Sequence, residues 1–160
     1  PAAPALEPAR KPVPLPQPAA EMREAILTAV HAGSIDELRI PLEWNEMKPD
    51  VAPGRVDDPV AYWRQISGDG EGREILAVLG RILELPHAVE PLGKDFENNR
   101  VFVWPYLALA DLSKLTPAQE VELYRLVSPA EAKVMRERKK WTWWRLSIGA
   151  DGTWHSFVRE

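Results

Sequence analysis

Apolar residues recur at helical spacing in two long segments of the chain. In residues 19–33, AAEMREAILTAVHAG, they form one stripe, and Gly33 follows as a typical helix-ending residue. That stripe consists of Met22, Ile26, Ala29 and Val30. The pattern is stronger in residues 72–85, GREILAVLGRILEL, where the apolar face consists of Ile75, Leu76, Val78, Leu79, Ile82 and Leu83. Both segments are predicted to be amphipathic helices that bury one face in the core.

Four shorter helices are predicted from their start signals. A Ser, Thr or Asp before a proline supplies an N-cap acceptor and a residue suited to the first helical position. The signal occurs at Asp58-Pro59, Thr116-Pro117 and Ser128-Pro129. Gln119 and Glu131 complete capping boxes in the last two, and Ser34 with Glu37 forms another, which opens a short helix before Pro41. The segment between Pro41 and Asp58 is rich in turn-forming residues.

Strand-forming residues replace the helical pattern in residues 98–110, NNRVFVWPYLALA. The strand formers are Val101, Phe102, Val103, Trp104 and Tyr106. Pro105 lies among them and has no backbone N–H to offer a neighbouring strand. We therefore predict a strand whose course is broken at Pro105 by an edge, a bulge or a bend.

The chain closes on a tryptophan-rich hairpin, residues 139–160, KKWTWWRLSIGADGTWHSFVRE. Its GADGT stretch is typical of a three-residue loop with Gly152 in the left-handed position of a bulge. The favoured register pairs Ile148 with Trp154, Leu146 with Ser156 and Trp144 with Val158. One face then carries Trp144, Leu146, Ile148, Trp154 and Val158, and the other carries Trp143, Arg145, Ser147, His155 and Phe157. A two-residue turn at Asp151-Gly152 would instead move His155 and Phe157 to the apolar side.

Aromatic residues on both hairpin faces admit two interpretations. In the first, helices cover one face, the sheet curls over the other, and all the aromatic residues are core. In the second, an open groove binds a sugar, an aromatic ligand or a peptide. The candidate ligand-binding residues are Trp104, Tyr106, Trp143, Arg145, His155 and Phe157. Packing is the commoner use of an aromatic stripe.

Two parts of the chain differ sharply in composition. Residues 1–19, PAAPALEPARKPVPLPQPA, are predicted to be a disordered Pro/Ala-rich linker, because dense proline prevents regular helix and sheet ladders. Residues 20–160 are predicted to form a single α+β domain. Its N-terminal and central helices would pack on a small, curved, mainly antiparallel sheet that ends in the C-terminal hairpin.

The start of the chain suggests its location. It begins on Pro rather than Met, followed by small apolar residues, as expected of a mature chain after removal of a signal peptide. We therefore expect a periplasmic or secreted bacterial protein, held away from a membrane or cell wall by its linker.

Several chemistries find no support in the sequence. The chain has no cysteine and no apolar run of transmembrane length. Its net charge of −4 argues against a nucleic-acid partner. No cofactor or metal is predicted, because His31, His87 and His155 stand far apart without a second ligand at metal spacing. No catalytic residue is assigned, since the candidate acid pairs, Glu43–Glu46 and Asp95–Glu97, are interpreted as solvated.

Two resemblances follow from these motifs. The segment from VFVWPYLALA to SPAEAKVM, followed by IGADGTWHSFV, is similar to an uncharacterised family of exported alphaproteobacterial proteins, over residues 20–160. An early helix, ILTAVHAGSIDELR, with the late hairpin also resembles the cone fold of the nuclear-transport-factor-two-like superfamily, although helices between Thr116 and Lys140 depart from its usual order. The first resemblance implies a periplasmic protein and supplies no catalytic residues.

Three functions follow as hypotheses. The leading one is a non-catalytic envelope module that binds a cell-wall fragment, a small molecule or an envelope protein through the aromatic hairpin face and the Trp104–Tyr106 edge. The second is a cone-fold enzyme with His155, Asp95 or Glu97 as general base. The third is a structural component of an envelope complex, which would need a large apolar patch.

Overall fold

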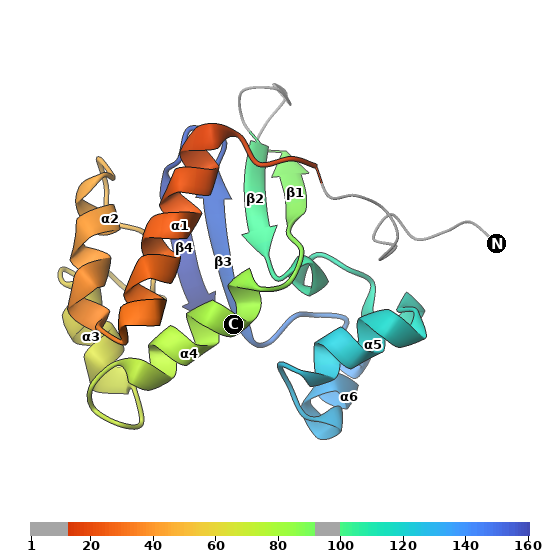
Figure 1. The fold of residues 1–160 in the computed structure, drawn as a ribbon. Helices are drawn as coiled ribbons and strands as arrows, with labels where there is room; N and C mark the ends of the chain where they lie inside the picture. The colour runs from red at the N-terminus through yellow and green to blue at the C-terminus, as the bar shows by residue number, and fades with distance from the viewer. Residues whose placement is uncertain (1–12, 92–99) are drawn as a thin grey trace.

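A four-stranded antiparallel sheet forms the centre of the fold, and two long helices cover one of its faces (Figure 1). The computed structural model describes residues 13–91 and 100–160. The strands are β1 Ala88–Pro91, β2 Arg100–Trp104, β3 Trp144–Gly149 and β4 Trp154–Arg159, adjacent in that order. The predicted α+β class with a C-terminal hairpin is confirmed.

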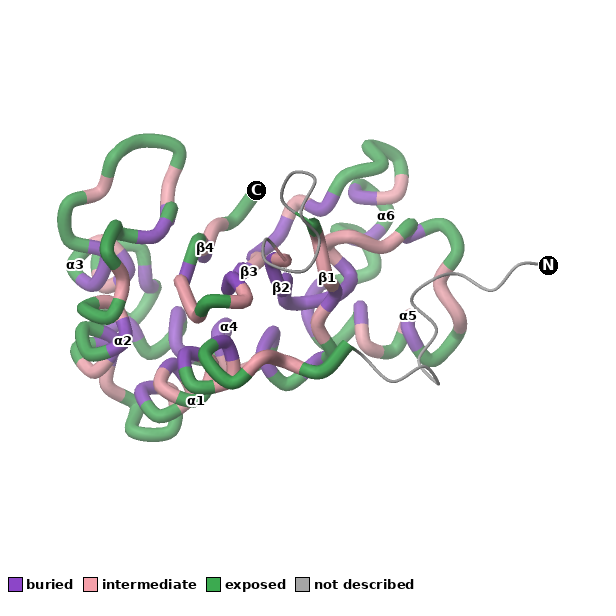
Figure 2. Tube along the Cα trace, turned by 90° about the horizontal axis from the view of Figure 1, so that it is seen from above, coloured by how far each residue is buried: buried purple, intermediate pink, exposed green. Residues whose placement is uncertain are grey.

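The two long helices, α1 and α4, are those that the apolar periodicity predicted. Helix α1 spans Gln17–Ala32 and α4 spans Arg73–Leu83; they contact each other, and both contact β3. All six residues of the predicted apolar face of α4 are buried. Seen from above, the buried positions lie between these helices and the strands (Figure 2). The core therefore forms where two amphipathic helices lie against one sheet face.

Helix α1 begins inside the segment predicted to be linker. Residues 17–19 are its first helical residues, and Pro18 lies at a position where a missing N–H is tolerated. Residues 1–12 of the predicted linker lie outside the described residues.

Short helices lie at the two ends of the sheet (Figure 1). The 3₁₀ turn η1 Ile35–Leu38, α2 Arg39–Glu43 and α3 Pro59–Ile66 lie at one end. The turns η2 Tyr106–Ala108 and η3 Leu112–Lys114, with α5 Pro117–Tyr124 and α6 Pro129–Arg138, connect β2 to β3 at the other. Strand β2 ends at Trp104, and the chain bends at Pro105 before η2 begins at Tyr106, which is one of the three roles predicted for Pro105.

Three of the four predicted start signals act as caps. The side chains of Asp58, Thr116 and Ser128 each accept a hydrogen bond from the backbone N–H three residues on. Only Thr116 forms the full reciprocal capping box, with Gln119. The box predicted at Ser34 is wrong, because the chain closes a 3₁₀ turn there and the N–H of Glu37 donates to the backbone carbonyl of Ser34.

The hairpin loop is the predicted one, but the register changes within the strands. Gly152 has φ 91°, and its N–H donates to the Gly149 carbonyl at 2.9 Å. Ile148 pairs with Trp154 as predicted. A bulge then shifts the register, so that Leu146 pairs with Phe157 and Trp144 with Arg159. The predicted pairs Leu146–Ser156 and Trp144–Val158 are wrong, because β4 contributes one residue more than β3 at the bulge.

The segment after α2 holds the bulged strand in place. The side-chain amide of Asn45 donates to the Trp154 carbonyl at 2.8 Å and accepts from the Trp154 N–H at 3.0 Å. The backbone of Asp50 forms a parallel bridge with Ser156. Its N–H donates to the His155 carbonyl and its carbonyl accepts from the Phe157 N–H, both at 2.9 Å. These bonds pair the outer edge of β4, which would otherwise be open.

Candidate functional site

The aromatic residues of the predicted binding face are buried. Trp104, Tyr106, Trp143 and Phe157 all lie in the hydrophobic core. Phe157 stacks on Trp144 at 4.7 Å between ring centroids, and Trp154 stacks on Trp63 at 5.5 Å. We call Trp63, Trp144, Trp154 and Phe157 the aromatic cluster. In the structure these side chains form core rather than an open groove.

The polar residues of the same predicted site each have their own surroundings in the described part of the chain. The Tyr106 hydroxyl donates to Glu122 Oε1 at 2.6 Å, and burial together with that carboxylate raises the pKa of Tyr106. Tyr106 therefore stays protonated and serves as a structural donor. Arg145 pairs with Glu160 at 3.8 Å, and His155 is exposed on β4.

Of the three candidate general bases, His155 alone lies within the described residues. Asp95 and Glu97 lie outside the described residues. His87 is half-buried against the rings of Phe102 and Trp104, at 5.4 Å from each, and its Nε2 bonds to the Val13 carbonyl. Within residues 13–91 and 100–160, no group of three or more His, Asp or Glu side chains is placed to hold a metal ion.

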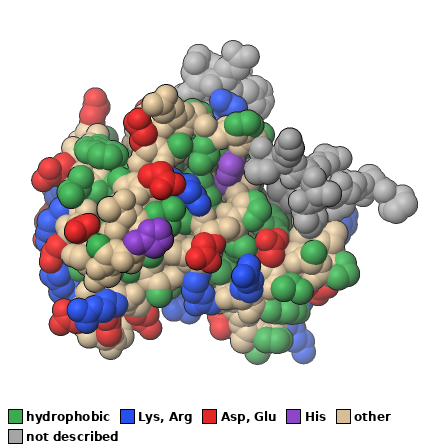
Figure 3. Space-filling view, in the orientation of Figure 1, with side chains coloured by type: hydrophobic (Ala, Val, Ile, Leu, Met, Phe, Trp, Pro, Cys, Tyr) green, Lys and Arg blue, Asp and Glu red, His purple; other side chains and the backbone are tan. Residues whose placement is uncertain are grey.

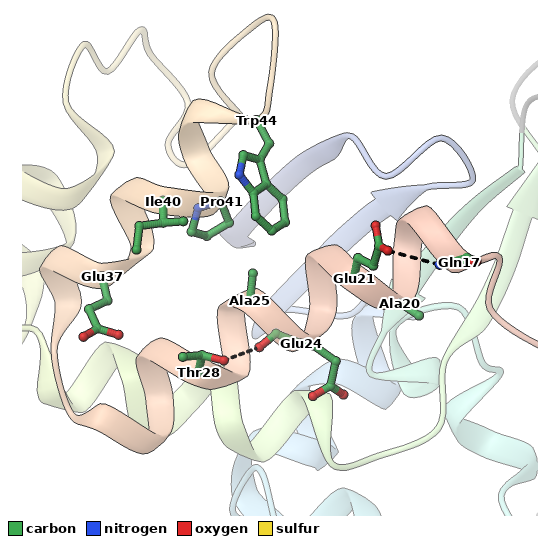
Figure 4. Close-up of a pocket in the computed structure, with 10 residues that line it drawn as sticks. All are labelled: Gln17, Ala20, Glu21, Glu24, Ala25, Thr28, Glu37, Ile40, Pro41 and Trp44. Carbon is green, nitrogen blue, oxygen red and sulfur yellow. Dashed lines mark hydrogen bonds between the residues drawn. The ribbon is translucent and has the colours of Figure 1, made fainter.

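A different part of the molecule offers an open apolar surface. Ile40 and Trp44, on and just after α2, are each 57% exposed and face helix α1 across a groove of about 520 Å³ (Figure 4). We call this the α1–α2 groove. It is lined by Gln17, Ala20, Glu21, Glu24, Ala25, Thr28, Glu37, Ile40, Pro41 and Trp44. Its size is that of a ligand or peptide site.

The groove exists because α1 carries two different stripes. One stripe, with Met22 and Ile26, is buried against the sheet side of the core. The second stripe lines the groove and carries small side chains at Ala20, Ala25 and Thr28, together with the exposed Gln17, Glu21 and Glu24. Small side chains cannot fill the space between two helices, so a gap remains where α2 passes α1.

Helix α2 is nevertheless fixed in position. Ile35 and Leu38 of the preceding turn are fully buried, and Pro41 is buried beneath the groove. The next residue after Trp44 is Asn45, which is bound to the backbone of Trp154 on both its amide atoms. Trp44 is therefore presented by a rigid support, although its own side chain stays exposed.

The groove has acidic borders. Glu21, Glu24 and Glu37 lie on its rim, and no Lys, Arg or His is among its lining residues in the described part of the chain. Glu21 accepts from Gln17 at 3.2 Å, and Glu24 forms an exposed pair with Arg23 at 3.1 Å. Arg23 offsets part of the charge of Glu24, and the carboxylates of Glu21 and Glu37 have no basic partner among the described lining residues, so the rim stays acidic.

Other exposed apolar residues lie at the far end of the molecule. Figure 3 shows apolar side chains at the surface over α5 and α6 as well as over α2. Val121, Tyr124 and Val134 account for the exposed large apolar side chains of α5 and α6. Arg136, from the basic segment of α6, bonds to the Leu112 carbonyl and to Glu120, so it serves the local structure.

Sequence reasoning missed the α1–α2 groove. Trp44 lies in the turn-rich segment that follows Pro41, where no periodic pattern predicts its neighbours. The available signal was on α1, where Gln17, Ala20, Glu21, Glu24, Ala25 and Thr28 recur at helical spacing and form a stripe without a large apolar side chain.

Comparison with known proteins found no protein similar to this chain. No protein-family model, no curated protein and no solved structure gave a match. Among the helices of the described ranges, none combines the length and apolar character needed to cross a lipid bilayer.

Proposed function

We propose that this chain is a non-catalytic binding module of the bacterial envelope, and that it takes its partner or ligand in the α1–α2 groove. The observation that carries the proposal is the exposure of Trp44. Every other tryptophan of the chain is buried, whereas Trp44 stands at the mouth of a groove with an apolar floor. Exposed tryptophan beside an apolar hollow is typical of binding surfaces, where such residues carry much of the binding energy.

The acids of the groove fit a binding role better than general acid–base catalysis. Glu21, Glu24 and Glu37 lie on the rim, and the side chain of Glu24 is 70% exposed. A general acid or base usually works from an enclosed position, where burial adjusts its pKa to the task. The hypothesis of a cone-fold enzyme therefore gains no support from this groove.

A structural component of an envelope complex remains the second candidate. The observation in its favour is the exposed apolar surface of α5 and α6, where Val121 is 64% exposed. Two separate apolar surfaces would suit a protein that bridges two partners.

The envelope location rests on the proline-dense segment of residues 1–19 and on the resemblance to exported alphaproteobacterial proteins. Proline at this density favours an extended spacer in the part of the segment before α1, and such a spacer suits a binding domain held away from a membrane or cell wall. The location is tested by fusing the natural full-length protein to a reporter enzyme that becomes active only outside the cytoplasm. Reporter activity supports the envelope, and its absence in an expressed fusion contradicts it.

The groove itself is tested with Nile red, a neutral dye whose emission shifts to the blue in apolar surroundings. We expect saturable binding at one site, weakened at least about tenfold in the double variant Ile40→Ser/Trp44→Ser, because anchor residues carry most of the energy. Val121→Ser is the matched control, since it removes an exposed apolar side chain on α5 and should leave binding unchanged. Equal binding by the double variant and the wild type would contradict the proposal.

A further inference from the structure

The length of the α1–α2 groove indicates an elongated occupant. Its lining residues on α1 run from Gln17 to Thr28 and include positions three, four, seven, eight and eleven residues after the first. At a rise of 1.5 Å per residue, this stripe is about 16 Å long, or three helical turns. A three-turn groove matches a short helix better than a compact small molecule.

The walls of the groove suit a helix as well. The α1 wall has small side chains at Ala20, Ala25 and Thr28, and the longer Gln17, Glu21 and Glu24 of the same wall are exposed, so a helix could pack there at the roughly 8–10 Å between axes that is usual for packed helices. The opposite wall is formed by Ile40, and by the Trp44 indole, which extends from the end of α2 toward α1 (Figure 4). A helix between α1 and α2 would pack apolar side chains at i, i+3, i+4 and i+7 against both walls.

The charge of the rim selects the polar residues of that helix. Glu21, Glu24 and Glu37 border the groove, and its lining in the described part of the chain contains no basic side chain. An occupant with Asp or Glu beside its apolar face would meet repulsion, whereas Lys or Arg would pair with the rim. Resting on the proposed function, we infer that the α1–α2 groove docks an amphipathic helix of a partner protein whose apolar face is flanked by Lys or Arg.

A second copy of this chain is the competing occupant. Helix α6 carries Lys133, Arg138 and the 44% exposed Val134, and it lies at the opposite end of the molecule from α2 (Figure 1). Docking of α6 from one copy into the groove of the next would join molecules head to tail. The experiment therefore includes a measurement of self-association.

The probe is a capped, fluorescein-labelled peptide of about 15 residues, with Leu at the i, i+3, i+4 and i+7 positions and Lys elsewhere. Its matched control replaces every Lys by Glu. Fluorescence anisotropy against the full chain at low salt should show the Lys peptide binding about tenfold or more tightly than the Glu peptide. That preference should shrink at high salt, because counterions screen exposed charges.

Variants of the chain assign the binding to the groove and to its rim. Trp44→Ala should abolish measurable binding of the Lys peptide. The triple variant Glu21→Gln/Glu24→Gln/Glu37→Gln should lower its affinity about tenfold. A control triple variant, Glu71→Gln/Glu84→Gln/Glu137→Gln, removes the same charge from exposed positions outside the groove lining and should leave the affinity within twofold.

The outcomes separate this inference from the proposed function. Equal binding of the Lys and Glu peptides, or binding of Nile red without either peptide, would overturn the inference and leave the binding module standing. Loss of both dye and peptide binding in a folded chain would overturn both. If sedimentation shows self-association that Trp44→Ala abolishes, the occupant is a second copy and the inference is overturned.

Discussion

Two regions of this molecule carry tryptophan and use it in opposite ways. In the aromatic cluster, Trp154 stacks on Trp63 and Phe157 on Trp144, and all four side chains are buried. In the α1–α2 groove, Trp44 stands 57% exposed above small side chains. The tryptophans of the tryptophan-rich C-terminal segment are buried, whereas the single tryptophan of the turn-rich segment is exposed.

The difference shows that exposure is decided by what the rest of the chain places opposite a residue. Hairpin aromatics lie against α1, α3 and α4, whose apolar faces remove them from water. Trp44 faces a stripe of α1 on which Ala20, Ala25 and Thr28 are small and Glu21 and Glu24 stay exposed, so nothing large and apolar covers it from that side. Local aromatic density is therefore a weak indicator of a binding surface, and the size of the opposing side chains is a better one.

The largest expected effect is loss of stability on truncating the aromatic cluster. Trp154→Ala removes a fully buried indole from its stack with Trp63 and should lower the free energy of unfolding by about 3–5 kcal/mol. Urea denaturation followed by circular dichroism measures it. A cost below about 1 kcal/mol would mean that the cluster is loosely packed, and the contrast with Trp44 would disappear.

A smaller effect is expected at the residue that joins the two regions. Asn45→Ala removes both side-chain hydrogen bonds to the Trp154 backbone and leaves that N–H and carbonyl unpaired, at a cost of about 1–3 kcal/mol. Asn45→Asp is the control, because its carboxylate still accepts from the N–H but donates nothing to the carbonyl. Its stability, measured in the same urea titration, should fall between those of Asn45→Ala and the wild type. Wild-type stability in Asn45→Ala would show that the β4 edge does not depend on this residue.

The packing of His87 against Phe102 and Trp104 of β2 is tested by the pH dependence of stability. Burial and the nearby Arg23 lower the pKa of His87 below its ordinary 6.5, against the opposing effect of the bond to Val13. The unfolded chain then binds the proton more readily, so the contribution of His87 to the free energy of unfolding is fully present above pH 6.5 and is lost as the pH falls from 6.5 through the lowered pKa of the folded chain. His87→Gln should reduce this loss when both proteins are denatured over a pH series. If the free energy of unfolding falls equally in both proteins over that range, His87 is not shielded from water as the structure indicates.

The smallest expected effect is on the stability of the groove variant. Trp44→Ala removes an exposed side chain that no hydrogen bond in the described part of the chain fixes, and it should change the free energy of unfolding by less than about 0.5 kcal/mol. The urea titration used for Trp154→Ala measures it. A loss comparable to that of Trp154→Ala would show that Trp44 is core, and the groove would not exist as an open surface.

The fold was predictable where the signal lies within one element. The apolar stripes of α1 and α4, the cap at Asp58 and the left-handed Gly152 each depend on residues a few positions apart. The bulge in β4 was not predictable in this way. It depends on Asn45 and Asp50, about a hundred residues earlier, which pair with the outer edge of the strand.

The candidate site was less predictable than the fold for the same reason. The residues predicted to bind, with Trp143 and Phe157 among them, carry aromatic chemistry that serves a core equally well. Only the tertiary arrangement tells the two uses apart. Ala25 lies in α1 and Trp44 just after α2, and nothing within either segment fixes the distance between them.

The most direct test of the account is acrylamide quenching of tryptophan fluorescence in the wild type, Trp44→Phe and Trp143→Phe. Acrylamide is neutral, so the acidic rim does not repel it, and it quenches accessible indoles far more than buried ones. The account predicts that Trp44→Phe removes most of the readily quenched emission, whereas Trp143→Phe leaves it unchanged. If the quenched emission persists in Trp44→Phe and disappears in Trp143→Phe, the accessible surface lies at the hairpin, and the central claim is wrong.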